Sequence, residues 1–313
     1  MNIKNVSYKN DEINGSLLVI NFKGKHAVYQ ILNSIRQACI NQVPIYAFDA
    51  KNINIIKNNT VFDNTETKLR MSQIPIYNLE LDNYNNNDDD NEIIVEAYVK
   101  KKNNTLKLMY VDTNDIIIKI NSTLINNTDM YSKDYPIVIT KLRPNEELEC
   151  SLKSALNNGD YNSIYNGSSC YWKKHSDEEY DLKIEGNGQM KEYNLIIKVC
   201  EILIDKFELL YKNFSNEQYK VVTFGKNKVI IEIYNENYIT FGPINYMLQN
   251  LEDVHKSGIS PISYLEKKMQ LSVETYNKNP LEDILIAIND CVKLYTDIKN
   301  DLIKILKKKY NFL

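Results

Sequence analysis

The stretch that decides the fold of this chain reads Asn33-Ser34-Ile35-Arg36-Gln37-Ala38-Cys39-Ile40-Asn41-Gln42-Val43-Pro44. It belongs to a longer segment, His26 to Ile40, whose apolar residues recur at helical spacing and predict an amphipathic helix with one buried face. Pro44 cannot continue a helix, so the helix is expected to end before it. The preceding segment, Gly15 to Lys23, alternates and is rich in apolar and β-branched residues, which predicts a strand.

The composition places the chain among globular proteins. Its 313 residues suffice for about two domains, and 43% of them are hydrophobic and 25% charged. The formal net charge of -3 argues against a dedicated nucleic-acid clamp, because such a clamp needs a basic face. No apolar run reaches the roughly 18 residues of a membrane span, and the first residues lack the apolar core of a signal peptide. We therefore expect a soluble intracellular protein without membrane contact.

The cysteines and arginines are the most informative residue types. The five cysteines are odd in number and contain no C-x-x-C pair, so we expect reduced core residues and no structural zinc. They are Cys39, Cys150, Cys170, Cys200 and Cys291. Only Arg36, Arg70 and Arg143 stand among 38 basic residues, which suggests sites that need a planar, bidentate guanidinium; chance is the alternative explanation.

The middle of the chain changes character. Between Ala50 and Glu185 the pattern becomes one of short strands, at Glu92 to Val99, Thr105 to Val111 and Ile137 to Lys141, separated by polar loops. This pattern predicts a separate β-rich unit. The polar, acidic stretch Asn83 to Asn91 predicts a mobile loop within it.

The last part returns to long helices and short strands. Predicted elements are a helix at Met190 to Tyr211, strands at Tyr219 to Phe224, Lys228 to Tyr234 and Met269 to Thr275, a helix near Thr240, and a helix opening at Pro280. The hydroxyl of Thr240 is expected to cap its helix, with Pro243 in the first turn. The final helix carries an apolar seam too long for a small sheet to cover, so we expect it to pack on the Met190 to Tyr211 helix.

No local motif supports catalysis. The three histidines, His26, His175 and His255, stand in no nucleophile or metal motif and are expected at the surface. Gly186-Asn187-Gly188 lacks the rest of a phosphate-binding loop. We therefore predict no catalytic, cofactor-binding or metal-binding residues, and an assembly function instead. An enzyme with a hidden site is the other class left open.

Several motifs resemble, in order, the α-like subunits of multisubunit RNA polymerases. The stretch Asn33 to Pro44 is similar to the first helix of that family, and Asn59 to Asp63 followed by Leu69 to Ile76 is similar to its N-[ST]-x-[VL] and H-R-L-G-L-I-P stretches. Arg36 and Arg70 fall on family arginines. Lys141 to Leu148, Trp172, and Leu182 to Gly188 with the helix after it match further family motifs in sequence order.

The last third resembles the smaller α-like partner, the eukaryotic eleventh and archaeal L subunit. The matching segments are Lys228 to Tyr234, Ile239-Thr240-Phe241-Gly242, and Asn279-Pro280-Leu281 with its helix. The chain departs from the pattern at Gln37, Ile239, Pro243 and Tyr246. Together the resemblances imply a fused third-subunit-like and eleventh-subunit-like chain from a nucleocytoplasmic large DNA virus.

The resemblance implies an α+β fold in which two α-like dimerisation modules form a pseudo-dimer within one chain. The expected domains are 1-49 plus 180-215 (third-subunit-like), 50-179 (β-rich insert) and 216-313 (eleventh-subunit-like). Together with the apolar helix faces it predicts a subunit interface at Asn33, Ile35, Arg36, Cys39, Arg70, Ile197, Leu203, Phe207, Thr240, Phe241, Gly242, Leu285, Ile288 and Val292.

The function that the resemblance implies is a non-catalytic assembly platform of a viral DNA-directed RNA polymerase. Its partners would be the two large catalytic subunits and small polymerase subunits, with DNA reached only through the complex and no cofactor. Its expected location is the viral factory in the host cytoplasm and the virion. The alternative is a free-standing protein-interaction or virion structural protein with the same fold.

Overall fold

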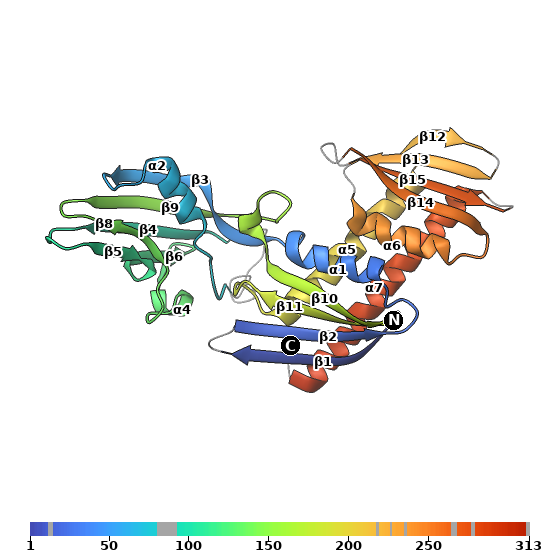
Figure 1. Ribbon diagram of the computed structural model, residues 1–313, viewed down its shortest axis with the longest axis horizontal. Coiled ribbons are helices and arrows are strands. Elements are labelled where there is room, and N and C mark those ends of the chain that lie inside the picture. The colour runs from blue at the N-terminus through green and yellow to red at the C-terminus, as the bar shows by residue number, and fades with distance from the viewer. Residues whose placement is uncertain are drawn as a thin grey trace. The chain divides into compact units, whose positions relative to one another are not determined.

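The computed structural model describes residues 1–11, 15–79, 93–216, 219–225, 227–234, 237–263, 268–276 and 279–310. The loop predicted at Asn83 to Asn91 lies outside these residues. Within them the chain has six α-helices and four antiparallel sheets, which confirms the α+β class (Figure 1). The chain divides into two compact units, which we name the helical unit (Met1–Val43, Ser168–Glu185 and Glu192–Leu313) and the insert unit (Pro44–Gly167 and Gly186–Lys191).

The first half of the helical unit is built around one four-stranded sheet, with strands in the order β1-β2-β11-β10. Its elements in chain order are β1 (Asn2–Asp11), β2 (Gly15–Lys23), α1 (Tyr29–Asn41), β10 (Ser168–Ser176), β11 (Glu179–Gly186) and α5 (Glu192–Ser215). The insert unit interrupts this half between α1 and β10.

The second half repeats the same plan. Its elements are β12 (Lys220–Phe224), β13 (Lys228–Tyr234), α6 (Tyr238–Gln249), β14 (Val254–Ser263), β15 (Lys268–Thr275) and α7 (Pro280–Tyr310). Both halves run strand, strand, helix, strand, strand, helix. Both sheets also place the half's first, second, fourth and third strands side by side, because the second sheet has the order β12-β13-β15-β14. The turn after α6 takes only residues 250–253, where the first half carries the insert.

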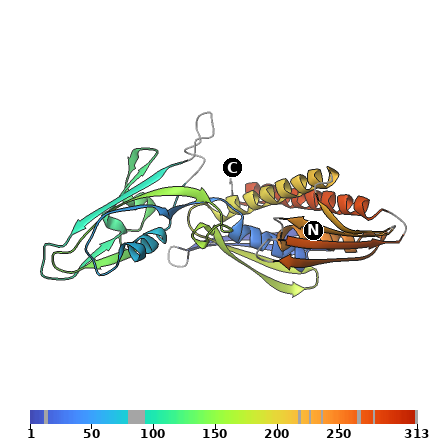
Figure 2. The same cartoon turned by 90° about the horizontal axis from the view of Figure 1, so that it is seen from above.

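The halves meet through helices. The long helices α5 and α7 lie side by side, and the short helices α1 and α6 contact each other (Figure 2). Phe207 of α5 and Tyr295 of α7 stack with ring centroids 5.4 Å apart, and both are fully buried. The predicted packing of the terminal helix on the helix around Met190 to Tyr211 is confirmed.

The helix α6 begins differently from the expectation. Its N-cap is Asn237, whose side chain accepts a 2.9 Å hydrogen bond from the Ile239 N–H, so the predicted cap at Thr240 is wrong. The Thr240 hydroxyl instead donates to the Asn237 carbonyl, 3.1 Å away. An asparagine three residues upstream satisfies one of the free N–H groups of the first turn, which moves the start to Tyr238 and places Pro243 inside the helix.

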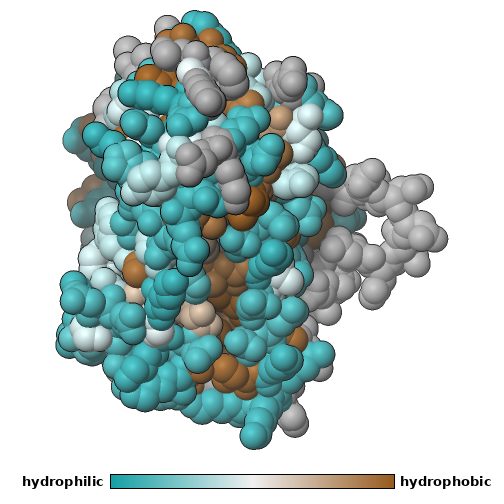
Figure 3. Space-filling view, turned by 90° about the vertical axis from the view of Figure 1, so that its right-hand side faces the viewer, coloured by the Kyte–Doolittle hydropathy of each residue, from teal (hydrophilic) through white to brown (hydrophobic). Residues whose placement is uncertain are grey.

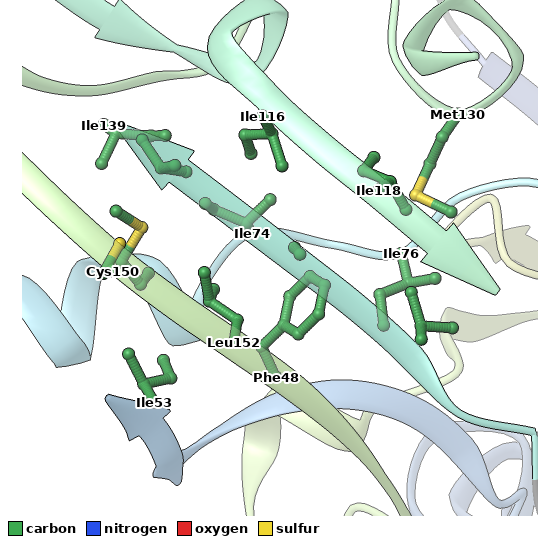
Figure 4. Close-up of a cluster of buried hydrophobic side chains, with 14 of the residues drawn as sticks. Phe48, Ile53, Ile74, Ile76, Ile116, Ile118, Met130, Ile139, Cys150 and Leu152 are labelled. Atoms are coloured by element: carbon green, nitrogen blue, oxygen red, sulfur yellow. The ribbon is translucent and has the colours of Figure 1, made fainter. Parts of the chain in front are cut away.

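The insert unit is β-rich, as the strand pattern predicts. Its elements are β3 (Ile45–Asn58), α2 (Asn64–Ser72), β4 (Val95–Lys102), β5 (Met109–Asp112), η1 (Thr113–Asp115), β6 (Ile116–Ile120), β7 (Thr123–Ile125), α4 (Asn127–Met130), β8 (Val138–Leu142), β9 (Glu147–Asn157) and η2 (Ser163–Tyr165). One sheet has the order β3-β9-β4-β6-β7, and β5 pairs with β8 in another. Side chains from these strands and from the segment after α2, including Phe48, Ile74, Ile118 and Leu152, close its apolar core (Figure 4).

The limits of the insert unit differ from the range predicted for the insert, 50-179. Strand β10 belongs to the helical unit because it pairs with β11 there, and the segment Gly186–Lys191 belongs to the insert unit. The buried side chain of Gln189 holds that segment: its Oε1 accepts from the Tyr46 N–H at 2.8 Å and its Nε2 donates to the Tyr46 carbonyl at 2.8 Å. The domain ranges themselves stay a prediction. Among the described residues, no helix combines the length and apolar character needed to cross a bilayer.

Candidate subunit interface

The exposed side of α1 carries two predicted interface residues. Asn33 and Arg36 are both partly exposed, one turn apart on the same helix. The Asn33 Oδ1 accepts hydrogen bonds from the Arg36 Nε, at 3.1 Å, and from its Nη2, at 3.0 Å. The guanidinium is thereby held in one orientation, and its remaining N–H groups donate to no group that the structure describes. Within the described part of the chain, Arg36 forms no ion pair.

The opposite side of α1 is closed to any outside partner. Ile35 and Cys39 are fully buried, and the Ser168 hydroxyl of β10 donates a 2.9 Å hydrogen bond to the Cys39 carbonyl. Burial raises the pKa of the Cys39 thiol well above its usual range. These two residues therefore serve packing inside the helical unit.

The contact between α1 and α6 contains the next group of predicted residues. Thr240, Phe241 and Gly242 are all buried on α6. A Cβ at Gly242 would lie 4.0 Å from the Gln30 carbonyl oxygen of α1, so the two helices approach closely at this point. Nearby, the Tyr246 hydroxyl donates a 2.8 Å hydrogen bond to the Lys25 carbonyl, which adds a further link between the halves.

The helices α5 and α7, which pack on each other, carry the rest of the predicted helix residues, and Phe207 stacks on Tyr295 across this contact. Leu203, Phe207 and Ile288 are fully buried, whereas Ile197, Leu285 and Val292 are half-buried. At the edge of this contact, the Lys299 Nζ lies 3.0 Å from the Glu201 Oε1. Burial raises the pKa of Cys200 to about 12, so this neighbouring thiol stays protonated near neutral pH.

Arg70 lies in the insert unit, separate from the other predicted residues. Its Nε is 3.1 Å from the Glu66 Oε1, its Nη1 donates to the Ile139 carbonyl at 3.3 Å, and its guanidinium lies 4.1 Å from the centre of the Phe62 ring. These three partners all belong to the insert unit. Arg70 thus joins α2 to β8, although its side chain remains 43% exposed.

Sequence reasoning missed two polar contacts of the helical unit: the bond of Ser34 joins the halves, whereas Lys206 and Gln42 both belong to the first half. Ser34 is 1% exposed and donates a 2.6 Å hydrogen bond to the Ile239 carbonyl, and the Lys206 ammonium of α5 donates to the Gln42 side chain after α1. Ser34 carried a usable signal, because it is a polar residue on the apolar side of an amphipathic helix. Lys206 carried none, since lysine is common on exposed helix faces.

The remaining polar groups show no reactive arrangement in the described ranges. All five cysteines are buried and none of them forms a disulfide, which confirms the prediction of reduced core residues. His175 and His255 are exposed, as predicted, with His175 Nε2 2.7 Å from the Asp181 Oδ2, whereas His26 is half-buried beside Tyr246. No group of histidine, cysteine and acidic side chains among the described residues could hold a metal ion.

Comparison with known proteins gives one clear relative. The chain is 24% identical, over 332 aligned positions, to a protein of Acanthamoeba polyphaga mimivirus named "Putative DNA directed RNA polymerase subunit R470". The alignment covers 93% of this chain and 91% of that protein, so the likeness extends through both halves and the insert. No family model matches the chain. The chain is therefore a distant, full-length homologue of a viral protein that bears an RNA polymerase subunit name.

Proposed function

We propose that this chain is the α-like, non-catalytic assembly subunit of a viral DNA-directed RNA polymerase. In this proposal its two halves pair as an intramolecular pseudo-dimer, the first with its insert at 50-179, and the paired halves dock the two large catalytic subunits. The observation that carries the proposal is the repeated plan of the helical unit, with the same element order and the same strand order in both halves. The full-length likeness to the mimivirus protein supports the placement in a polymerase.

The way the halves contact each other supports the pseudo-dimer. In a two-fold symmetric dimer the same surface of both subunits is buried, so elements that lie next to the symmetry axis meet their own counterparts in the partner. Here α5 contacts α7 and α1 contacts α6, and in each pair the two helices occupy the same position in the plan of their halves. A covalent link between such halves raises the effective concentration of one for the other, to roughly millimolar for a short flexible linker. Pairing then precedes every step that involves another chain.

The docking surface in this proposal is the exposed side of α1. Ile35, Cys39, Leu203, Phe207 and Ile288 are buried within the helical unit, so their role is packing inside it, and Phe207 stacks on Tyr295 of the other half. Asn33 and Arg36 remain accessible, and a guanidinium oriented by Asn33 is suited to charge-assisted hydrogen bonds with a carboxylate or with backbone carbonyls. Small polymerase subunits would complete the complex, DNA would be reached only through it, and the site of action would be the viral factory and the virion.

Co-expression tests the proposal directly. The full tagged chain is produced with the two large polymerase subunits of the same virus and purified through its tag. Recovery of both large subunits in equal amounts with the chain is the expected result. Recovery of the chain alone, or with capsid proteins from infected cells, would contradict the proposal and favour a free-standing interaction or virion structural protein.

A further inference from the structure

A loop in the insert unit exposes leucine to an unusual degree. Residues 103–108 connect β4 to β5, and Leu106 is 94% exposed and Leu108 63% exposed. Tyr110, two residues further along, is 50% exposed. Single exposed apolar residues are common, but apolar side chains that gather on one loop and the strand after it mark an interaction surface.

The buried side chain of Asn103 fixes the shape of this loop. Asn103 is 0% exposed. Its Nδ2 donates to the Lys107 carbonyl at 2.7 Å and to the Leu142 carbonyl at 3.0 Å, and its Oδ1 accepts from the Thr105 N–H at 2.9 Å and from the Thr105 hydroxyl at 2.7 Å. These bonds hold the loop in one shape before anything binds it, which lowers the entropy cost of ordering the loop on docking.

The strand after the loop extends the same surface. In β5 the side chains alternate, so Tyr110 faces outward while Val111 faces the core, and Leu108, directly before the strand, is exposed like Tyr110. Tyr110 pairs with Lys141 of β8, whose Nζ lies 5.1 Å from the centre of the Tyr110 ring. We name the set Leu106, Lys107, Leu108, Tyr110, Lys141 and Arg143 the tip patch.

The charge on the tip patch is of one sign. Lys107, Lys141 and Arg143 are all exposed, and none of them forms an ion pair with a carboxylate that the structure describes. The Glu146 carboxylate lies beside them, since its Oε2 accepts a 2.7 Å hydrogen bond from the Arg143 N–H, so the three cations leave a local excess of positive charge on a chain whose net charge is -3. An acidic counterpart is the complement that such a surface attracts.

We propose that the tip patch docks into an apolar pocket with an acidic rim on another protein subunit of the polymerase, a statement that rests on the function proposed above. Leu106 and Leu108 enter the pocket, and the three cations face the carboxylates around it. A nucleic acid is the less suitable partner, because Leu106 and Leu108 offer no flat ring on which a base can stack, and the Lys141 ammonium lies over the one aromatic ring of the patch, that of Tyr110. The partner is therefore recognised by the combination of apolar anchors and positive charge.

Leu124 of β7 provides a matched control for the test. It lies in the same unit and is 65% exposed, but it lies outside the tip patch. A photo-reactive benzoylphenylalanine is placed at position 106 or at position 124 of the full chain, and the chain is co-expressed with the polymerase subunits and irradiated. Position 106 should form a crosslink to one defined polymerase subunit, and position 124 should form none to that subunit.

Substitution gives the second measurement. Leu106→Asp should weaken binding of the crosslinked subunit by about tenfold or more, and Leu124→Asp should leave that binding unchanged. Both variants should unfold at the same urea concentration as the parent, because both leucines are exposed. A parent chain that assembles with the polymerase, but whose position 106 crosslinks only to nucleic acid or to nothing, overturns the tip-patch proposal alone. A parent chain that assembles with no polymerase subunit overturns the proposed function as well.

Discussion

The Ser34 hydroxyl of α1 donates a 2.6 Å hydrogen bond to the backbone carbonyl of Ile239 in α6. Inside a helix this carbonyl would accept from the N–H of the residue four positions later, but that residue is Pro243, which has no N–H. A side chain from the first half thus satisfies a carbonyl that a proline frees in the second half. The bond is buried, since Ser34 is 1% exposed, and it fixes α1 against α6 at one position.

Ser34→Ala should lower the free energy of unfolding by about 1–3 kcal/mol, because it leaves the buried Ile239 carbonyl without a donor. Urea unfolding of the full chain, followed by circular dichroism, measures the change. The serine is small and its replacement leaves almost no cavity, so loss of the hydrogen bond accounts for the effect.

The control for this prediction is the same substitution in a Pro243→Ala background. Alanine at position 243 restores an N–H that can reach the Ile239 carbonyl, so Ser34→Ala should cost clearly less there. An equal cost in both backgrounds would show that the hydrogen bond from Ser34 does not substitute for the missing helix bond.

Ile288→Asp should separate the two halves of the helical unit. Ile288 is fully buried in α7, and an unpaired carboxylate there should cost several kcal/mol, on the scale of the whole stability of a domain of about 5–15 kcal/mol. Limited proteolysis near Tyr211 to Glu217, the connection between the halves, measures the separation. This connection begins in the last turn of α5, which ends at Ser215.

The matched control is Ile286→Asp on the same helix. Ile286 is 46% exposed, so an aspartate there should leave the rate of cleavage close to that of the parent. If Ile288→Asp is cleaved no faster than Ile286→Asp and still captures the large subunits, the contact between the halves does not hold the molecule together.

The sequence predicted those elements whose apolar residues recur with a clear period. Strand β13 has the predicted ends, Lys228 and Tyr234, and α7 opens at Pro280 as expected. Strands β1 and β14 were not predicted. β1 lies at the edge of its sheet, where a largely polar strand is tolerated, so it lacks a clear apolar pattern. β14 is also an edge strand and contains Pro261, which an edge strand tolerates but which in a sequence indicates a turn.

The candidate site was predictable only where one helix face determines it. The buried faces of α5 and α7 follow from periodicity, which predicts the burial of Leu203, Phe207 and Ile288; their role in a subunit interface stays a prediction. The partners of Arg70 were not found, because Ile139 is 69 positions away in the sequence and the contact with Phe62, just before α2, depends on the path of the chain into the helix. Tertiary contacts of this kind leave no local pattern in the sequence.

The purified chain should contain no stoichiometric zinc. The five cysteines are buried as separate core residues, and no metal-binding group occurs in the ranges that the structure describes. Elemental analysis of the full chain, purified without chelators, measures the ratio of metal to protein. A zinc ratio near one would contradict this prediction and would require ligands from outside the described residues.

The insert unit should lose stability in acid through Glu147. A hydrogen bond from Lys57, whose Nζ lies 2.7 Å from the Glu147 Oε2, is the largest cause that lowers the pKa of this carboxyl below its ordinary value of 4.5. A lowered pKa in the folded state means that the contribution to stability is present above the ordinary value. This contribution to stability is lost as the pH falls through the lowered pKa of the folded state.

Urea unfolding at a series of pH values tests this coupling. The unfolding midpoint of the parent should fall as the pH drops below 4.5, and Lys57→Met should flatten that part of the profile. Lys133→Met is the control, because Lys133 is exposed and forms no ion pair with a described carboxylate. Identical pH profiles for all three proteins would show that Glu147 and Lys57 are not coupled.

Arg36→Ala should weaken capture of a large polymerase subunit without unfolding the chain. The only side chain that the Arg36 guanidinium contacts by hydrogen bonds in the described structure is Asn33 on its own helix, so folding loses little. Docking should lose about 2–5 kcal/mol if the guanidinium is buried against a carboxylate or carbonyls in the complex. Binding to the isolated large subunits and urea unfolding of the same samples are measured in parallel.

Arg36→Lys keeps the charge but cannot form a bidentate contact, so it should restore only part of the affinity. Full affinity with lysine would reduce the role of Arg36 to simple charge attraction, and a lowered unfolding midpoint in Arg36→Ala would assign the residue to the internal fold.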